Sequence, residues 1–363
     1  MTAPLRVLLL PADEGACGLY RMISPARAVA AATNDVELYV AKGLVGRQTR
    51  DAQGVVTTNY LEPINADVVV YQRPMFDALV STIPLVQAQG ITVVVELDDD
   101  IVGVPSHNQA YQIVHPMFNL QTNWKHLQRA CAMADWMTCT TPALGERYMP
   151  GRYTVVPNYV PRSLTAMARP DHGSLVTLGW TGTLAVHAQD LQSVGSAVAQ
   201  VIQQTSCNFL VVGESRGVGA ALGLHADPPE TGWIPLPYYP DNLVKLDVGI
   251  VPLEPNSFNQ AKSWLKGMEM AAVGVPFVAS PTAEYLRLNE LGIGIIAHRR
   301  KDWLSALTRL VADVEYRTEL AGCGRELVRQ RLTIEGNVEQ WIAAWHTARR
   351  RTLHGTAETA SGS

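Results

Sequence analysis

The side chains best placed to do chemistry lie in one stretch of the chain, residues 259–269. An apolar segment at 247–251 precedes this stretch and is typical of a strand, and a helix is predicted from about Ser263. Such a strand–loop–helix junction lies at the carboxyl end of a strand, where open α/β sheets bind ligands. The free N–H groups and the positive dipole end of a helix attract anions, and Lys262 adds a full charge there. The stretch therefore predicts an anion site.

Lys262, Lys266 and Glu269 are spaced by four and then three residues, so a helix presents them on one face. The two cations suit a diphosphate, and the carboxylate can accept hydrogen bonds from two sugar hydroxyls. A solvated ion pair between Lys266 and Glu269 is the plain alternative, and it would contribute little to stability. We favour the binding role because these residues follow a strand and a loop.

Two more residues are candidates for catalysis, His187 and Asp100. His187 precedes Asp190 by three residues, and Asp190 either caps a helix or holds the imidazole in one tautomer. Asp100 ends the acidic run 96–100 after an apolar strand, where it could orient an acceptor hydroxyl. A metal site is the alternative for this run, because hard cations take oxygen ligands. We expect the acidic edge of a cleft and no metal.

A loop at residues 13–21 follows the first apolar segment and contains Gly15 and Gly18. The two glycines would let the backbone approach a bound phosphate or sugar, and Arg21 could pair with an anion. The glycine spacing of a dinucleotide-binding loop is absent. A plain tight turn is the alternative, and we expect a loop that lines a cleft.

Short aliphatic segments alternate with longer amphipathic ones, which is the pattern of an α/β protein. The strand segments are continuous apolar runs, as expected of parallel strands covered on both faces. The predicted strands are Arg6–Leu10, Val36–Val40, Asp67–Tyr71, Thr92–Leu97, Trp136–Thr140, Thr154–Val156, Val176–Trp180, Cys207–Val212, Asp247–Val251 and Pro276–Ala279. The predicted helices include Ser24–Ala32, Asn123–Ala134, Asp190–Thr205 and Ser263–Val273.

The length of 363 residues, with 47% hydrophobic and 17% charged residues, favours two globular domains. We predict an N-terminal Rossmann-like domain over residues 1–160 and a second one over 175–330, facing each other across a cleft. A segment with prolines and a glycine at 161–174 is the predicted linker. A closing helix is expected at 331–350 and a disordered tail at 351–363.

The overall charge and the cysteines exclude several functions. The net charge is −4 without a basic stripe, so nucleic-acid binding is not expected. The five cysteines fit no metal-ligand spacing, which favours a reduced, cytoplasmic protein. No stretch approaches the ~20 apolar residues that span a bilayer, so no transmembrane segment is expected. Peripheral contact with a membrane is left open.

The segment 247–280 resembles the donor-binding region of group-one GT-B glycosyltransferases, the nucleotide-sugar-dependent bacterial or phage type. The family patterns D-[IV]-G-[IV]-x-P-L, F-N-x-x-K-S-x-x-K and E-x-x-A-x-G-x-P are met here in this order. Residues 178–190 (LGWTGTLAVHAQD) and 155–160 (VVPNYV) also resemble family patterns. The likeness is good over residues 135–346 and looser over the first 130. Each pattern alone is moderately specific, and their order makes the set specific.

The resemblance implies a GT-B fold and a hexosyltransferase-like transfer of sugar from a nucleoside-diphosphate sugar to an acceptor hydroxyl, with retention of configuration. In such enzymes the residue matching Glu269 binds the ribose. The turn at Gly182 and Thr183 and the junction at Lys262 and Ser263 lie near the diphosphate. The acceptor, a glycan, a lipid or a protein, would be held by the N-terminal domain. No metal or other cofactor is required in this scheme.

One departure from the family pattern limits what the resemblance implies. Many relatives carry a second glutamate eight residues before the first, near the donor sugar, and here that position is Ala261. The sugar, and to a lesser degree the retention of configuration, is therefore open. A sugar-nucleotide epimerase, a phosphorylase of the same fold and a catalytically idle sugar-nucleotide-binding protein are the alternatives.

Overall fold

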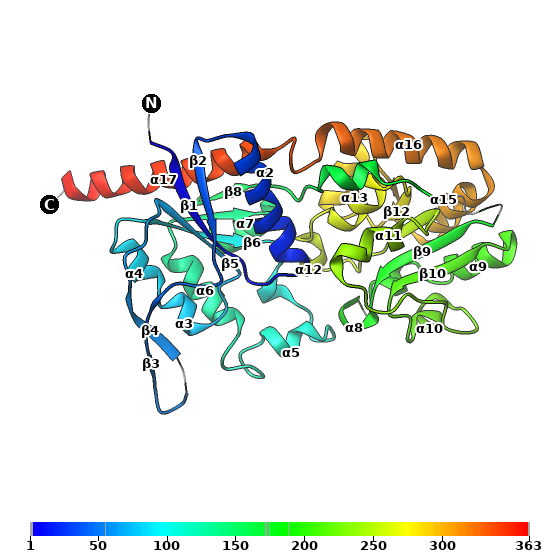
Figure 1. Cartoon of the computed structure of the whole chain (residues 1–363). Helices are drawn as coiled ribbons and strands as arrows, with labels where there is room; N and C mark the ends of the chain where they lie inside the picture. The colour runs from blue at the N-terminus through cyan, green and yellow to red at the C-terminus, as the bar shows by residue number, and fades with distance from the viewer. Residues whose placement is uncertain (1–2, 55, 171–172, 174, 188, 362–363) are drawn as a thin grey trace. The chain divides into compact units, whose positions relative to one another are not determined.

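The computed structural model describes residues 3–54, 56–170, 173, 175–187 and 189–361. It divides into two compact units (Figure 1). The first unit comprises residues 1–104, 110–158 and 337–363, and the second comprises residues 105–109 and 159–336. Each unit is built around one parallel sheet with helices. The predicted α/β class with two Rossmann-like domains is confirmed.

The first unit contains a six-stranded sheet of order β2-β1-β5-β6-β7-β8, in which every pairing is parallel. The three strands β5, β6 and β7 are buried along their whole length. This explains the continuous Val-rich sequences of β5 and β6, since strands covered on both faces contact apolar neighbours on both sides. The strands are β1 (Leu5–Leu10), β2 (Val36–Val40), β5 (Val68–Gln72), β6 (Thr92–Leu97), β7 (Trp136–Cys139) and β8 (Tyr153–Val155).

Helical segments flank this sheet, and local signals fix several of their starts. Asn123 caps α6 by accepting a hydrogen bond from the Lys125 amide at 3.0 Å, and Thr141 with Pro142 begins α7. The segments are α1 (Ala16–Gly18), η1 (Leu19–Ile23), α2 (Ser24–Ala32), α3 (Asp77–Val80), α4 (Ile83–Gln87), η2 (Ile101–Gly103), α5 (Ala110–Val114), α6 (Trp124–Met133), α7 (Pro142–Tyr148) and α17 (Val338–Ser361).

A hairpin of β3 (Gly46–Arg50) and β4 (Val56–Leu61) was not predicted from the sequence. Its two strands are antiparallel, and every residue of β3 is exposed. Such strands lack the continuous apolar run that marked the others, so the sequence pattern did not reveal them.

The last helix, α17, belongs to the first unit although it follows the second along the chain. It contacts α2, β6 and β7, and it buries Trp341 and Trp345. Arg349 Nη1 donates to the Gly90 carbonyl at 2.8 Å. Residues 351–361, predicted to be disordered, continue α17, while 362 and 363 lie outside the described residues.

The second unit contains a five-stranded parallel sheet of order β10-β9-β11-β12-β13. The chain moves from β9 to β10 on one side and later to β11 on the other, so the strand order reverses at β9. Ligands of open α/β sheets bind at such a reversal, beyond the carboxyl ends of the strands. The strands are β9 (Thr177–Gly182), β10 (Asn208–Gly213), β11 (Val248–Val251), β12 (Phe277–Ala279) and β13 (Ile295–Ile296).

The core of the second unit packs around Trp180 and Trp303, on β9 and α15, which are both fully buried. The predicted helix 190–205 is interrupted, because Gly195 adopts a left-handed φ of +59° between η4 and α9. The helices are η3 (Arg162–Ala166), α8 (Leu184–His187), η4 (Leu191–Ser193), α9 (Ala197–Thr205), α10 (Val218–Leu222), η5 (Leu236–Tyr238), α11 (Tyr239–Leu243), α12 (Ser257–Gln260), α13 (Leu265–Ala272), α14 (Ala283–Glu290), α15 (Arg300–Ala312) and α16 (Val314–Arg331).

The predicted linker 161–174 contains the short helix η3. Its residues 171, 172 and 174 lie outside the described part of the chain. None of the helices in the described ranges combines the length and the apolar composition needed to cross a bilayer.

Candidate functional site

A pocket of about 370 Å³ opens at the carboxyl ends of β9 and β10 in the second unit. This is the edge of the sheet at which the strand order reverses. The residues that line it are Thr181, Gly182, Thr183, His187, Val212, Gly213, Glu214, Gly232, Trp233, Ile234, Tyr239 and Lys266. Four of the predicted site residues therefore meet in one pocket: Gly182, Thr183, His187 and Lys266.

Lys266, on the first turn of α13, supplies the cation of this pocket. Its Nζ donates to the Thr181 carbonyl at 2.7 Å and lies 5.7 Å from the centroid of the Trp180 ring. Burial lowers the pKa of Lys266 to about 8; Lys262 acts in the same direction, while Asp190 and Glu269 oppose the shift. The ammonium is thus mostly charged at neutral pH, and an anion in the pocket would stabilise it further.

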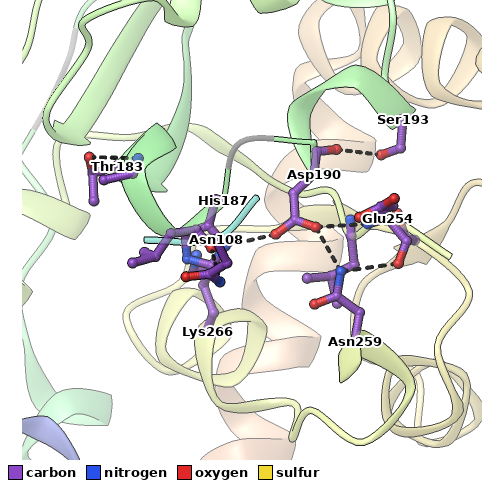
Figure 2. Close-up of polar contacts among 12 residues, drawn as sticks. Asn108, Thr183, His187, Asp190, Ser193, Glu254, Asn259 and Lys266 are labelled. Carbon is purple, nitrogen blue, oxygen red and sulfur yellow. Dashed lines mark hydrogen bonds and ion pairs between the residues drawn. The ribbon is translucent and has the colours of Figure 1, made fainter. Parts of the chain in front are cut away.

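His187 and Asp190 form a hydrogen-bonded pair beside Lys266 (Figure 2). His187 Nδ1 lies 2.7 Å from Asp190 Oδ2, and the imidazole meets the Trp180 ring edge-on at 5.9 Å. Burial, followed by the charge of Lys266, lowers the pKa of His187 to about 4 despite the Asp190 carboxylate. At neutral pH the ring is therefore neutral, with its proton on Nδ1 toward Asp190 and a lone pair on Nε2.

Asp190 connects the histidine to the loop after β11. Its Oδ1 accepts hydrogen bonds from the Glu254 amide at 2.8 Å and from Asn259 Nδ2 at 2.7 Å (Figure 2). Burial alone would raise the pKa of Asp190, but the hydrogen bonds from His187, Glu254 and Asn259 hold it below its ordinary value. Asp190 does not cap a helix with its side chain. Asp190 was predicted either to cap a helix or to hold His187 in one tautomer, and its contacts in the structure fit the second role.

The turn at Gly182 and Thr183 forms the wall of the pocket. Gly182 has a φ of +144°, and a Cβ there would lie 3.1 Å from both His187 Cδ2 and Trp180 Cζ2. Only glycine fits this backbone and this space. Thr183 Oγ1 donates to Glu214 Oε2 at 3.1 Å, so the turn is tied to the end of β10.

Three predicted donor-site residues, Lys262, Ser263 and Glu269, are not among the described residues that line the pocket. Lys262 Nζ lies 4.2 Å from the centroid of the Phe258 ring. The helix was predicted to begin at Ser263, but α13 begins at Leu265 with Trp264 at its N-cap. The helix thus starts two residues later than predicted, and residues 257–260 form a separate helical turn, α12.

Glu269 is only 6% exposed, in the middle of α13. Its negative charge acts on the ammonium of Lys266. It also acts on Tyr239 and Tyr285, and the pKa values of these two hydroxyls are raised first by burial and then by Glu269. Glu269 thus lies near two pocket residues, Lys266 and Tyr239.

Eight further residues line this pocket that sequence reasoning did not name as site residues, among them Glu214, Trp233 and Tyr239. Glu214 follows β10 directly, and Trp233 is 81% exposed in the segment between α10 and η5. An acidic residue at the carboxyl end of a predicted strand was the available signal for Glu214. An exposed tryptophan has no signature in the sequence, because burial is decided by distant residues.

The predicted loop of Gly15, Gly18 and Arg21 belongs to the first unit, and the structure corrects part of its role. Arg21 is 2% exposed, and its Nε donates to Glu96 Oε1 at 2.8 Å. Its Nη1 donates to the Pro157 carbonyl and Asn158 Oδ1, both at 3.2 Å. Nε and Nη1 therefore pair inside the protein, whereas the buried Nη2 has no hydrogen-bond partner among the described residues.

The two glycines serve a turn around Asp13. Asp13 Oδ1 accepts hydrogen bonds from the amides of Gly15 at 2.8 Å and Gly18 at 3.1 Å. A Cβ on Gly18 would lie 1.8 Å from the Asp13 carbonyl oxygen. The tight turn therefore requires a glycine at position 18. A plain tight turn was the alternative interpretation of this loop. Gly15, in contrast, is exposed.

Asp100, predicted to orient an acceptor hydroxyl, is fully buried in the first unit. Its Oδ1 accepts from the Tyr148 hydroxyl at 2.8 Å and from the Gly103 amide at 3.1 Å. Arg147 Nη1 pairs with its Oδ2 at 2.8 Å. Burial raises the pKa of Asp100, and these partners oppose the shift. Asp100 caps η2 and is not presented to a substrate. In the described ranges, no group of three or more His, Cys, Asp or Glu side chains is placed to hold a metal ion.

Comparison with known proteins shows the fold. No protein-family model and no curated protein matches the sequence. The sucrose-phosphate synthase of Thermosynechococcus elongatus aligns over 99% of this chain and 100% of its own, with a TM-score of 0.58 and 14% identity. The HepE protein of Anabaena, solved with UDP, aligns over 94% and 98%, with a TM-score of 0.59 and 12% identity.

A protein from Listeria monocytogenes, described as a UDP-N-acetylglucosamine 2-epimerase, is similar at a TM-score of 0.50 and 13% identity, over 90% of this chain and 95% of its own. The similarity confirms the predicted GT-B fold, and at these identities it shows the fold alone.

Proposed function

We propose that this protein is a glycosyltransferase that moves a sugar from a nucleoside-diphosphate sugar to an acceptor hydroxyl. The observation that carries the proposal is the position of Lys266, whose ammonium is fixed 2.7 Å from the Thr181 carbonyl in the wall of the pocket. A preorganised cation at the carboxyl edge of a parallel sheet suits a diphosphate. A HepE structure of the same fold contains UDP, which supports this choice of ligand.

In this scheme the second unit binds the donor and catalysis is mainly electrostatic. Lys266 and the Gly182–Thr183 turn contact the diphosphate as it departs, and Lys262 contributes a second positive charge with Ser263 close by. Preorganised charges of this kind stabilise a leaving group because they need no rearrangement during the reaction. The glycine turn matters because it brings backbone, not a side chain, to the phosphate.

His187 would accept a hydrogen bond from a hydroxyl of the donor sugar through Nε2. The bond from Nδ1 to Asp190 fixes this tautomer, and the pKa near 4 keeps the ring neutral. A base this weak is suited to orientation and not to proton abstraction. His187 is therefore assigned to the positioning of the sugar in the proposed reaction.

The ribose would be bound by Glu269, as the family resemblance implies, or by Glu214, which lines the pocket. The acceptor, a glycan, a lipid or a protein, would be held by the first unit. Retention of configuration and a hexose as the transferred sugar are part of the proposal. An epimerase reaction is the second candidate, because the epimerase from Listeria shares the fold and Ala261 replaces the expected second glutamate.

The test is a panel of UDP-, GDP-, ADP- and dTDP-sugars, with free nucleotide measured with and without added acceptors. We expect one donor to raise the melting temperature and to release nucleotide faster when its acceptor is present. Release of an epimerised donor would favour the epimerase, and binding without turnover would favour an idle binding protein. If no sugar nucleotide binds, the proposed function is wrong.

A further inference from the structure

A second pocket of about 390 Å³ lies in the second unit, at the edge of the sheet opposite the first pocket. Asp247, which lines it, directly precedes β11, and Gly274 lies three residues before β12, so the pocket is at the amino ends of these strands. The first pocket is at the carboxyl ends. The two pockets share no lining residue.

Three arginines line this second pocket: Arg169, Arg317 and Arg325. Each is anchored by backbone carbonyls. Arg169 donates to the carbonyls of Gly274 and Leu246, Arg317 Nη1 to Leu310 at 2.7 Å and Val311 at 3.0 Å, and Arg325 Nε to Thr165 at 2.8 Å. The guanidinium groups are therefore held in fixed positions before any ligand arrives.

The anchoring leaves donors on each guanidinium unused. Among the described residues, no hydrogen-bond acceptor contacts Arg325 Nη1, Arg169 Nε or Arg317 Nε. Two of the arginines converge beside Gly274, since a Cβ at that glycine would lie 3.4 Å from Arg169 Cδ and 3.8 Å from Arg325 Nη1. Free donors thus remain around a shared space.

Among the described residues that line this pocket, positive charges outnumber negative ones. Against three arginines, the described lining residues contain one carboxylate, Asp247, which already accepts from Arg169 Nη2 at 3.2 Å and from the Thr177 amide at 2.9 Å. Burial, with a contribution from Arg317 and Arg325, lowers the pKa of Arg169. The arginines are therefore close enough to repel one another, and an anion between them would relieve that repulsion.

We propose that this pocket is an anion site that binds a phosphate group, either as a free anion or as part of a phosphorylated metabolite. Planar guanidinium groups match the oxygens of phosphate, and fixed donors give affinity without a large loss of conformational entropy. The volume of about 390 Å³ holds more than one phosphate group. The proposal does not depend on the glycosyltransferase reaction, because the site lies at the other edge of the sheet.

Gly322 offers a test that leaves the arginines in place. It lines the pocket on α16, and a Cβ at Gly322 meets no atom within 4 Å. A glutamate there would stand three residues before Arg325 on the helix, where side chains are neighbours, and would supply the missing negative charge. Gly322→Gln is the matched control, because it has nearly the same shape and the same gain in helix propensity.

We would titrate the full-length protein with inorganic phosphate and with pyrophosphate by calorimetry, at constant ionic strength. The background is Lys266→Ala, which removes the cation of the first pocket. We expect phosphate to bind Gly322→Gln and to bind Gly322→Glu at least about tenfold more weakly. In phosphate-free buffer, Gly322→Glu should melt at a higher temperature than Gly322→Gln, and saturating phosphate should reduce this difference.

Equal affinity of the two variants for phosphate would overturn the proposal, as would an absence of binding in both. A further variant, Arg317→Gln, should weaken phosphate binding in the Gly322→Gln background and leave Gly322→Glu unchanged. Preference for pyrophosphate over phosphate would indicate that the natural ligand carries two phosphate groups. None of these outcomes requires turnover of a sugar nucleotide, so failure of the proposed function would be seen separately.

Discussion

Arg21 in the first unit and Lys266 in the second are both cations near a carboxyl edge of a parallel sheet, and they differ in where their counter-charge lies. Arg21 donates to the buried carboxylate of Glu96 at 2.8 Å. Lys266 donates only to a neutral carbonyl, that of Thr181, and among the described residues it forms no ion pair. The first cation contacts its carboxylate directly, whereas Asp190 and Glu269 act on the second without an ion pair among the described residues, so that a ligand anion can pair with it.

This comparison separates charges that build a protein from charges that serve a site. A buried ion pair such as Arg21 with Glu96 is costly to break, because the remaining charge has no water around it. Removing a cation that is held only by a carbonyl lowers the free energy of unfolding less, because no buried charge is left unpaired. Its removal does, however, take away the group that an anion would bind. Opposite outcomes of the two substitutions are therefore expected.

The largest expected effect is that of Arg21→Ala on stability. It leaves the Glu96 carboxylate buried without its cation, and we expect the free energy of unfolding to fall by about 3–5 kcal/mol. Urea denaturation measures this change. The paired variant Arg21→Met with Glu96→Gln should recover most of the loss. An unchanged free energy of unfolding in Arg21→Ala would show that the ion pair between Arg21 and Glu96 does not stabilise the first unit.

Lys266→Ala should have the complementary effect, on activity. We expect nucleotide release to slow by about 10²–10³-fold, the loss seen when one preorganised donor to a developing negative charge is removed. Its urea midpoint should stay close to that of the unaltered protein. Lys262→Ala is the control for simple charge loss and should reduce the rate less. Equal losses in the two variants would contradict the central place of Lys266.

His187→Ala tests the neutral member of the pocket. The loss of one hydrogen bond to a sugar hydroxyl should lower kcat/KM by about tenfold. The variant His187→Gln keeps an acceptor and should recover part of the rate. The pH profile of kcat/KM between pH 5 and pH 8 should have the same shape in His187→Ala and in the unaltered protein. A different shape would show that the histidine acts as a base.

The pKa of Lys266 near 8 predicts a loss of donor binding in alkaline solution. Only the protonated amine attracts the diphosphate, and its fraction falls as pH rises through 8. The kcat/KM for the donor should therefore drop about fivefold between pH 8 and pH 9. Lys266→Arg stays charged in this range, and its profile should lose the alkaline decline.

The smallest expected effect distinguishes Glu214 from Glu269 as the ribose ligand. Glutamine keeps a hydrogen-bond acceptor but removes the charge, so the correct substitution should weaken donor binding by about two- to threefold. Calorimetric titration of Glu214→Gln and Glu269→Gln with the donor decides between them. Glu269→Gln should also change the alkaline profile, because its carboxylate raises the pKa of Lys266.

The fold and part of the candidate pocket were predictable from the sequence, because the signals that reveal them lie within short segments of the chain. Short segments rich in β-branched and aliphatic residues located β2 and β6 at their observed bounds, Val36–Val40 and Thr92–Leu97. The strand–loop–helix order placed Lys266 near the end of a neighbouring strand, because parallel strands of one sheet end at the same edge. Periodicity and strand order are properties of short segments, so a sequence reveals them directly.

The partners of the charged residues were decided only by the tertiary structure. Arg21 and Glu96 are 75 residues apart in the chain, and Asp100 and Tyr148 are 48 apart. A charged residue after a strand has the same sequence signature whether it faces solvent, a ligand or an opposite charge. Which of these it meets depends on how distant strands and helices pack, and that packing made Arg21 and Asp100 structural while Lys266 and His187 came to line the pocket.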